Sequence, residues 1–311
     1  TAYEISLGLV GSEMCIRDSD NYHLDPCHFI TLPSFGWAAC LLLTDVKLEL
    51  IGDEEMYKYF EHGIRGGVAT ITMRYAAANL PTEEDYDATR PDSNILYLDA
   101  NNLYGHAMVQ PLPTGGFQWL SQADILSLQI TNIPEDASHG YVLEVDLEYP
   151  ESLHDAHNCY PLAPERLSVS HDMMSDYCRQ LHDELEVKCA ESQKLIPNLY
   201  PKRNYIVHYR NLQLYLRLGM KLTKIHRGIK FKQDRWLKPF IDFNTEKRKL
   251  ASTDFEKDLY KLLNNSMFGK SCENVRKYKK IQLVTKPEKF LKLTRKTDYE
   301  GAEIFSDDLV A

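Results

Sequence analysis

The sequence predicts an α+β fold, because strand-like and helix-like segments alternate without the regular βαβ rhythm of a parallel sheet. Residues 141–147 (YVLEVDL) alternate in the manner of a half-buried strand. Residues 237–268 follow a helical period and are strongly basic, with a break or entry turn expected at Pro239. The chain has 311 residues and shows no solenoid repeat, so it has room for roughly two domains, or for one large domain with insertions.

The first nineteen residues (TAYEISLGLVGSEMCIRDS) match nothing that follows. Their apolar start lacks the basic region and the small-residue cleavage site of a signal peptide. The stretch resembles a translated adapter sequence. We therefore expect residues 1–19 to be non-native and to replace an original N-terminal part, and fold prediction begins at residue 20.

The first elements follow from local patterns. An apolar run at residues 35–43 predicts a buried helix, and Gly63, Gly66 and Gly67 predict a glycine-rich turn. The polar, acidic residues 80–93 predict a surface loop.

A short apolar run, residues 95–98 (ILYL), predicts a buried strand that delivers Asp99 to its end. Residues 100–108 then turn into a helix.

The later elements are predicted in the same way. Ser170 and the residues after it read as an N-capped amphipathic helix. Residues 205–218 predict a helix closed by Gly219, and residues 228–231 predict a strand. The basic residues 279–297 contain short apolar runs that are compatible with a hairpin.

Charge is distributed unevenly along the chain. The formal net charge is −9, yet residues 201–300 hold 26 Lys/Arg and 10 Asp/Glu, a net of +16, so the other 211 residues carry −25. A basic segment of this kind predicts a polyanionic partner. No apolar run approaches the roughly 20 residues of a membrane helix, so no membrane partner is expected. The seven Cys include no C-x-x-C pair, which favours reduced thiols inside a cell.

Three groups of residues could carry chemistry. Asp99, at a strand end before a tight turn and an aromatic residue, suits a hard cation such as Mg²⁺. The alternative is an aspartate that only caps the next helix. Paired glycines in Ile64-Arg65-Gly66-Gly67 allow close approach to a phosphate, although on their own an ordinary turn explains them more simply.

The third group lies on one helical face, where Lys257, Lys261, Asn265 and Phe268 follow one another at steps of four, four and three residues. Lys249 lies one longer step upstream. Such a face could bind phosphates through lysine and a base through Phe268, or it could be a solvated basic face with Phe268 in the core.

Several other chemistries lose their usual support. His154, His157 and Cys159 have near-zinc spacing but lack a tight paired ligand motif, and a polar loop explains them better. The chain has no G-x-x-x-x-G-K-[ST], G-x-S-x-G or H-E-x-x-H motif, which are the signatures of P-loop NTPases, α/β-hydrolases and zincins.

In this order, the segments resemble family B DNA polymerases of the protein-primed branch, of the viral, organellar and Maverick/Polinton type. Residues 98–105 (LDANNLYG) resemble motif A, D-x-x-S-L-Y-P, and residues 261–269 (KLLNNSMFG) resemble motif B, K-x-x-x-N-S-x-Y-G. Residues 64–67 (IRGG) resemble the Y-x-G-G element between exonuclease and polymerase parts, and residues 22–45 resemble the stretch after the last exonuclease motif.

The resemblance implies a partial palm with an antiparallel sheet and helices, together with helical fingers. Residues 20–80 would end the exonuclease region and contain the linker with the GG turn. Residues 90–235 would be palm with a terminal-protein-type insertion, residues 236–278 the fingers helices, and residues 279–311 the start of a return to the palm.

The resemblance also implies roles for single residues in DNA synthesis from dNTPs with two Mg²⁺ ions. Asp99 would bind both metals, and it and Lys261 would be the catalytic residues. The nucleotide would be held by Asn102, Leu103, Tyr104 (the steric gate), Lys261, Asn265 and Phe268, with Lys249 helping and Lys257 contributing less. DNA would be contacted by Arg65, Gly66, Gly67, Ser266 and Gly269.

The departures from the family pattern concern single residues and one motif. Asn102 and Gly105 stand where Ser and Pro are usual, and Phe268 and Ile64 each replace Tyr. The D-T-D motif with the second metal-binding carboxylate does not occur within residues 1–311. We therefore expect a polymerase fragment that is inactive alone, with an inactive remnant that only binds nucleic acid as the alternative.

The implied partners are a DNA template and primer, dNTP and a terminal priming protein. The expected location is intracellular, in the nucleus or at a viral replication site.

Overall fold

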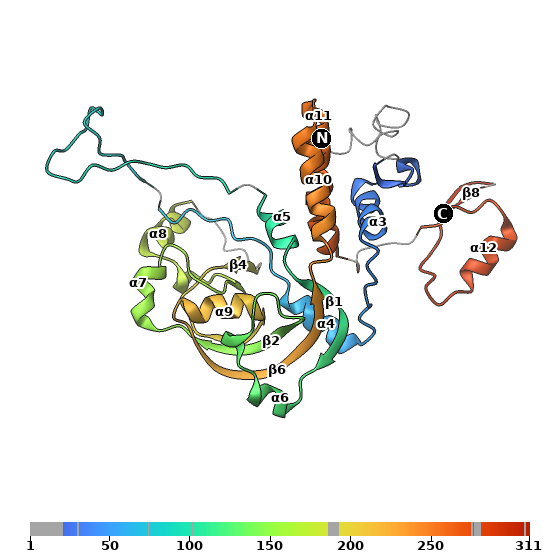
Figure 1. Cartoon of the computed structure of the whole chain (residues 1–311), viewed down its shortest axis with the longest axis horizontal. Helices are drawn as coiled ribbons and strands as arrows, with labels where there is room; N and C mark the ends of the chain where they lie inside the picture. Colours follow the sequence, from blue (N-terminus) through green and yellow to red (C-terminus); the bar gives the residue numbers. More distant parts are fainter. Residues whose placement is uncertain are drawn as a thin grey trace.

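The computed structural model describes residues 21–29, 31–73, 75–100, 102–185, 193–274, 276, 281–307 and 309–311. It combines a curved antiparallel sheet, flanked by helices, with a group of longer helices beside one end of the sheet (Figure 1). The α+β class predicted from the sequence is confirmed. Residues 1–19 lie outside the described residues. No helix in the described ranges has the length and apolarity needed to cross a membrane.

The main sheet has four strands in the order β1-β6-β2-β5, and all neighbours are antiparallel. The strands are β1 (Leu112–Trp119), β2 (His139–Glu148), β5 (Lys202–His208) and β6 (Lys221–Asp234). The long β6 and β2 bend strongly, so the sheet forms a hollow in which α9 (Tyr209–Arg217) lies (Figure 1).

The two faces of the sheet pack against different helices. On one face Leu143, Val145 and Leu147 of β2 pack with Leu212 of α9. On the other face Ile206 and Ile229 pack with Met56 and Tyr59 of α4 (Glu54–Gly63). The period of two along a strand explains this division, because successive side chains point to opposite faces.

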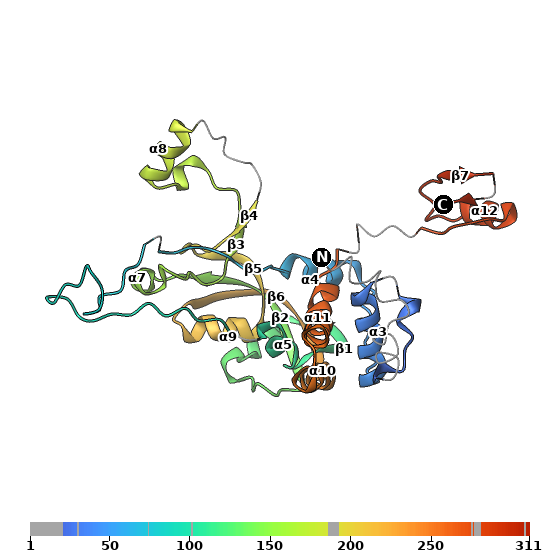
Figure 2. The same ribbon diagram turned by 90° about the horizontal axis from the view of Figure 1, so that it is seen from above.

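A second core joins the longer helices. It contains buried residues of α3 (Leu32–Thr44), α5 (Leu103–Met108), α10 (Lys238–Leu250) and α11 (Asp254–Ser271). Phe35, Cys40, Phe240, Leu263 and Met267 are each at most 2% exposed. The helices α10 and α11 form an antiparallel pair that rises from the sheet (Figure 1), and α3 lies alongside the pair in both views (Figures 1 and 2).

Smaller elements complete the chain. Between β1 and β2 lie α6 (Gln122–Ser127) and the 3₁₀ turn η2 (Ile130–Asn132), and η1 (Pro26–His28) precedes α3. The segment between β2 and β5 holds η3 (Glu151–Leu153), α7 (His154–His157), β3 (Glu165–Leu167), η4 (His171–Met173), α8 (Asp176–Glu184) and β4 (Lys194–Ile196). The C-terminal residues form α12 (Pro287–Thr294), β7 (Ile304–Ser306) and β8 (Leu309–Val310).

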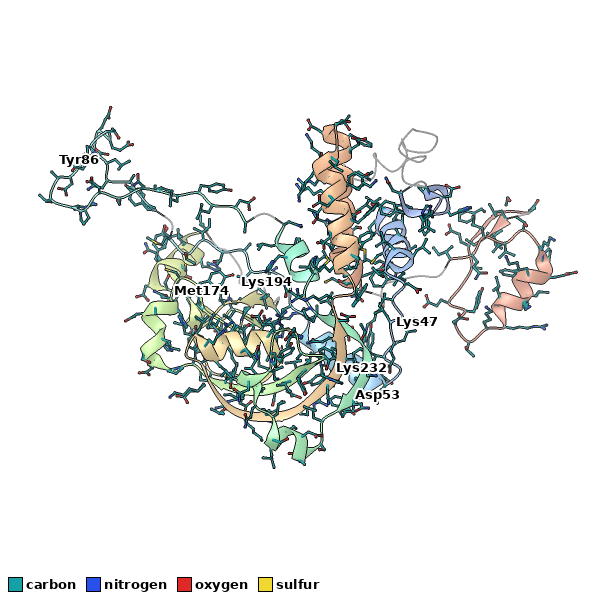
Figure 3. All side chains as sticks on the ribbon, viewed as in Figure 1. Lys47, Asp53, Tyr86, Met174, Lys194 and Lys232 are labelled. Carbon is teal, nitrogen blue, oxygen red and sulfur yellow. The ribbon has the colours of Figure 1, made fainter. Side chains whose placement is uncertain are left out.

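A loop projects far from the body between α4 and α5. Its end, at residues 79–93, is held by the buried Asn79, whose side chain donates to the carbonyls of Asp87, Arg90 and Pro91 at 3.0, 3.2 and 3.1 Å. Tyr86 lies at the far end of this projection (Figure 3). The surface loop predicted over 80–93 is confirmed, and hydrogen bonds from the Asn79 side chain hold it in a defined turn.

Several predicted elements are confirmed. The strands predicted at 141–147 and 228–231 lie within β2 and β6, and the helix predicted at 35–43 lies within α3. Only one face of α3 is buried, since Leu42 is 53% exposed. The turn into a helix after Asp99 is α5.

The strand predicted at residues 95–98 is wrong. The segment belongs to no sheet among the described residues, and its four side chains are 61–96% exposed. An extended apolar run becomes a strand only where a neighbour accepts its hydrogen bonds. Here β1 pairs with β6 and β5 pairs with β2, and neither edge reaches this segment.

Four further predictions need correction. Residues 205–208 belong to β5, so the helix predicted over 205–218 begins only at Tyr209. The helix expected after Ser170 begins later, capped by Ser175. The basic stretch 279–297 contains the helix α12 instead of a hairpin.

The fourth correction concerns residues 237–268. Pro239 does lie in the first turn of α10, but the pattern is broken at residues 251–253, where the chain reverses between α10 and α11. Thr253 caps the new helix in a capping box with Glu256, a signal that a purely hydrophobic period does not contain.

Candidate nucleotide and DNA site

The start of α5 is shaped by one asparagine and one glycine. Asn102 caps the helix in the left-handed conformation (φ 52°), and its side chain accepts a hydrogen bond from the backbone N–H of Gly105 at 3.2 Å. A Cβ on Gly105 would lie 2.3 Å from the Asn102 amide nitrogen. Proline, the usual residue at this position, lacks the N–H that Asn102 uses, so the two departures from motif A fit each other.

Asp99 stands just before this turn. Its carboxylate is exposed and makes no hydrogen bond or ion pair with any residue that the structure describes. A solvent-facing carboxylate with unused oxygen lone pairs fits a Mg²⁺ ion, which needs one or two such ligands and takes water and phosphate oxygens for the rest. No group of three or more His, Cys, Asp or Glu side chains gathers within the described residues, so Asp99 would act here as a single ligand.

The aromatic residues of the two motifs meet. Tyr104 in the first turn of α5 stacks on Phe268 of α11, with ring centroids 4.3 Å apart and planes 24° apart. Both rings remain open to solvent on their other sides, since Tyr104 is 51% exposed and Phe268 38% exposed. The pair therefore offers a flat aromatic surface at the junction of α5 and α11.

The face of α11 that leads to Phe268 carries the predicted phosphate and base contacts. Lys261, Asn265 and Phe268 lie at positions i, i+4 and i+7 of the helix, which places them in one stripe. Lys261 is exposed and has no ion-pair partner among the described residues. Asn265 is half-buried. A cation and an aromatic ring thus lie on one stripe, next to the α5 turn.

The other two lysines of the predicted group differ from Lys261. Lys257 lies on α11 but is paired with Asp254 at 3.0 Å. Lys249 lies on α10, across the turn at residues 251–253, and is paired with Glu246 at 2.7 Å. The expectation that Lys249 continues the same helical face as Lys257 is wrong because two separate helices carry them.

A buried polar network lies behind this stripe. The Asn244 amide of α10 donates to Asn264 of α11 at 2.9 Å, and Tyr22 donates to the Asn244 oxygen. Asn244 is fully buried and Asn264 is 5% exposed. The network fixes α10 against α11 at the level of motif B. Sequence reasoning missed it, because only the fold brings Asn244 next to Asn264.

The predicted DNA contacts fall into two groups. The Arg65 guanidinium donates to the carbonyls of Ile206 at 2.5 Å and Gly63 at 3.1 Å, and it lies 3.8 Å above the Tyr205 ring. Burial raises the pKa of the Tyr205 hydroxyl, so this ring stays neutral under the cation. Gly66 and Gly67 are exposed, with no neighbour within 4 Å of an added Cβ.

Ser266 and Gly269 lie on α11 with the motif B stripe. The Ser266 hydroxyl donates to the Leu263 carbonyl at 2.8 Å, and Gly269 is exposed with open space above it. The structure therefore brings Tyr104 together with Phe268. Arg65 is already bound to β5, and its contact with DNA stays a prediction, as do those of the other four residues.

Residues 43–310 match the family model of DNA polymerase type B, organellar and viral. A search of curated proteins gave no significant match.

Three structures of Phi29 DNA polymerase are similar to this chain at low identity. The orthorhombic crystal form has a TM-score of 0.47 at 15% identity, and it covers 84% of this chain and 39% of its own. The ternary complex with primer-template DNA and incoming nucleotide has a TM-score of 0.43 at 17% identity, and the match covers 78% of this chain and 36% of that one. The binary complex with primer-template DNA has a TM-score of 0.45 at 16% identity, and the match covers 84% of this chain and 38% of that one.

The chain thus spans less than two fifths of the length of those polymerases. The family model, in contrast, covers most of the chain, including both resembling motifs and the glycine pair. The chain belongs to the type B DNA polymerases of the organellar and viral kind.

Proposed function

We propose that this chain is the nucleotide-binding part of a DNA-directed DNA polymerase that is primed by a protein and replicates a viral or transposon-like DNA. The reaction adds a dNMP from a dNTP to a primer hydroxyl and releases pyrophosphate. The observation that carries the proposal is the stack of Tyr104 on Phe268, because it joins the two resembling motifs into one surface within the matched family region.

Each residue of this surface contacts a different part of the nucleotide. Lys261, an exposed cation without a partner among the described residues, binds triphosphate oxygens. The backbone N–H groups of Asn102 and Leu103, at the N-terminus of α5, face the same anion. Tyr104 lies under the deoxyribose and rejects a 2′-hydroxyl, and Asn265 and Phe268 line the base pair.

Because the two rings stack on each other, an incoming base must either extend the stack or displace one ring. Base–aromatic stacking contributes about 1–3 kcal/mol per base, comparable to or greater than the about 0.5–1.5 kcal/mol of an aromatic pair. The exchange is therefore favourable when the triphosphate is also bound. Lys249 and Lys257, already paired with glutamate and aspartate, contribute less than Lys261.

Asp99 would hold Mg²⁺, which when bound neutralises the triphosphate and activates the primer hydroxyl. The exposed carboxylate can do so because no described residue uses its oxygens. On the DNA side, Gly66 and Gly67 lie in the irregular segment after α4, without the turn expected from the sequence. Their lack of side chains would let the template backbone approach closely, while Arg65 holds this segment against β5. The insertion between β2 and β5 is the surface for a priming protein.

Nucleotide binding tests this proposal directly. We expect the chain to bind dNTP more tightly with Mg²⁺ than without it, and more tightly than the matching rNTP, in isothermal titration calorimetry. Asp99→Asn should abolish the Mg²⁺ dependence and leave metal-free binding intact. Equal binding of dNTP and rNTP, or the same Mg²⁺ dependence in Asp99→Asn, would contradict the assignment.

Primer extension tests the role of the missing carboxylate. Among the described residues, Asp99 is the one candidate metal carboxylate at the proposed site, and we expect this polypeptide alone to show little or no extension. Robust extension by the 311-residue chain would show that the site is complete without a second motif. A chain that bound DNA but no dNTP would instead favour the inactive remnant.

A further inference from the structure

A cavity of about 620 Å³ lies at the edge of the main sheet, outside the proposed nucleotide site. One side is formed by β1, β6 and the start of β2, and the other by the segment between β1 and β2, which contains α6 and η2. Figure 1 shows α6 below β6, whereas α5 and α11 lie above it. A volume of this size falls within the range of about 300–1,000 Å³ that is typical of small-molecule sites.

Three side chains from neighbouring strands form a row inside this cavity. Lys230 of β6 pairs in register with Gln118 of β1 and with Tyr141 of β2. Directly opposed residues of antiparallel strands point to the same face, so the three side chains lie side by side. The Tyr141 ring packs edge-on against Tyr209 of α9, with centroids 6.2 Å apart, which places the row on the face of the sheet that α9 covers.

Lys230 is half-buried, and its ammonium forms no ion pair with a residue that the structure describes. Asp124 of α6 lines the same cavity, but its carboxylate accepts hydrogen bonds from the Ser121 backbone N–H at 3.0 Å and from the Ser121 hydroxyl at 2.6 Å. These two bonds are the main cause of the lowered pKa of Asp124, and the charge of Lys230 contributes less. The cavity therefore contains a cation whose charge is not neutralised by a neighbour.

A second lysine lies next to the cavity. Lys232 is two residues further along β6, on the same face as Lys230 and about 7 Å away along the strand. It is exposed and forms no ion pair with a described residue. Burial, reinforced by these two lysines, lowers the pKa of His139, which pairs in register with Lys232 and lines the cavity. An anion bound here would meet two cations and a neutral imidazole.

The wall opposite the sheet is held in place by two glutamines. Gln213 of α9 donates to the carbonyls of Ile130 and Ile133 at 2.7 and 2.9 Å. Gln233 of β6, which is buried, donates to the carbonyl of Ala137 at 2.8 Å. These bonds fix the irregular segment 130–137 away from the sheet, so the cavity is already formed before a ligand enters, and binding does not require the segment to become ordered.

Part of the lining is apolar. Leu120 and Leu128 pack against the core beside α9, and Ile133 and Pro134 also line the cavity. The combination of a cation and an apolar surface suits a ligand that carries both an anionic group and an apolar body. An inorganic anion would leave the leucines in contact with water, and a neutral hydrocarbon would cover the charge of Lys230 without a counter-ion.

We infer that this cavity is a binding site for a small organic phosphate, a phosphate monoester carried on an apolar ring. A phosphate monoester is close to a dianion at pH 7, which matches two lysines better than a carboxylate or sulfonate does. Lys230 and Lys232 hold the phosphate, and the ring packs on Leu120 and Leu128. The inference does not rest on the proposed function, because none of Asp99, Tyr104, Lys261 and Phe268 lines the cavity.

Binding of 1-naphthyl phosphate to the 311-residue chain tests the site. Isothermal titration calorimetry compares this probe with inorganic phosphate, which lacks the ring, and with 1-naphthol, which lacks the anion. We expect 1-naphthyl phosphate to bind at least about tenfold more tightly than either, because each of the other two satisfies only one part of the lining. A fourth probe, dAMP, tests whether the site accepts a nucleotide as the source of the phosphate.

Hydrogen exchange followed by mass spectrometry locates the probe. We expect 1-naphthyl phosphate to slow exchange in residues 121–138, and to leave exchange in residues 102–108 and 261–269 unchanged. Protection confined to the latter two segments would place the probe in the nucleotide site and overturn the inference. This readout stands whether or not the nucleotide site is assigned correctly.

Three variants separate the cavity from a general effect of charge. Lys230→Gln should weaken 1-naphthyl phosphate binding about tenfold, because a charge-assisted bond is lost. The matched control, Lys221→Gln, removes a lysine of the same strand that is paired with Glu148 at 3.5 Å, and it should have less than a twofold effect. Ser127→Phe, at an exposed position of α6 that lines the cavity, fills space without changing charge and should also weaken binding.

Circular dichroism confirms that each variant is folded. Equal effects of Lys230→Gln and Lys221→Gln would show that only the overall charge matters and would overturn the inference. A loss in Lys230→Gln without a loss in Ser127→Phe would place the anion outside the cavity, which also contradicts it. Binding of inorganic phosphate as tight as that of 1-naphthyl phosphate would exclude a role for the apolar lining.

Discussion

The ring of Tyr104, in the first turn of α5, stacks on the ring of Phe268, near the end of α11, with their centroids 4.3 Å apart. The two residues lie 164 positions apart in the sequence. α5 and α11 are brought together by the core that Met108, Leu263 and Met267 share. The contact is the point at which the two resembling motifs become one surface.

Removing either ring of the stack should weaken nucleotide binding. We expect Phe268→Ala to reduce dNTP affinity about 5- to 100-fold, because stacking contributes about 1–3 kcal/mol per base. Tyr104→Phe should bind dNTP nearly as the wild type does, since it keeps the ring. Isothermal titration provides the measurement. Phe255→Ala, which removes an exposed ring at the other end of α11, is the control and should have no effect.

The lysines of the fingers should differ in importance. Lys261→Ala should reduce triphosphate affinity about 10- to 100-fold, because a charge-assisted hydrogen bond contributes about 1.5–3 kcal/mol. Lys257→Ala should change it less than threefold, since Asp254 already neutralises this lysine. Comparison of dNTP with the unphosphorylated nucleoside isolates the phosphate contribution. Equal effects of the two substitutions would contradict this ranking.

The asparagine pair between α10 and α11 should matter for stability. Asn264→Ala would leave the buried Asn244 amide without its acceptor, and we expect a loss of about 1–3 kcal/mol in the free energy of unfolding. Asn265→Ala, at a half-buried neighbour that forms no such bond with a residue the structure describes, should cost under about 0.5 kcal/mol. Urea unfolding followed by circular dichroism measures both. A larger loss for Asn265→Ala would show that the network does not hold the two helices.

His208 should make stability depend on pH. Burial, reinforced by Arg210, lowers the pKa of His208 to about 4 from its ordinary value of 6.5. The unfolded chain therefore binds a proton that the folded chain refuses between these values. The stabilisation is complete above pH 6.5 and is lost as pH falls toward 4, by up to about 3 kcal/mol.

The substitution His208→Asn isolates this contribution. The His208 ring accepts a hydrogen bond from the Arg210 N–H at the start of α9, and asparagine can cap the helix in the same way. The unfolding free energy of the wild type should fall relative to that of the variant as pH decreases from 6.5 to 4.5, because only the wild type contains the buried histidine. A constant difference over that range would refute the lowered pKa.

The sequence predicted the elements that local signals determine. Alternation located β2, and the turn expected after Asp99 located α5, although the residue that caps this helix is Asn102 and not Asp99. The split of α10 from α11 was missed because the apolar period continues through residues 251–253 while the capping box at Thr253 starts a new helix. The segment 95–98 was mistaken for a strand because apolar composition does not supply a hydrogen-bonding neighbour.

The sequence predicted which residues of the two motifs belong to the candidate site. It could not predict how those residues are arranged in space. Motif spacing indicated Tyr104 and Phe268 separately, but their contact depends on how α5 packs on α11. The same holds for Arg65, whose binding to the Ile206 carbonyl depends on β5 lying beside α4. Charge counting placed the cations within residues 201–300, whereas only the structure separates the lysines that have a carboxylate partner from those that have none among the described residues.

The most direct test of the nucleotide site is photocrosslinking with an azido-substituted dATP in the presence of Mg²⁺, followed by peptide mapping by mass spectrometry. The account predicts labelled peptides from residues 102–108 of α5 and 261–269 of α11, with labelling prevented by excess dATP and not by nucleoside. Labelling confined to other parts of the chain, or labelling of these peptides that excess dATP did not reduce, would contradict the assignment of the site.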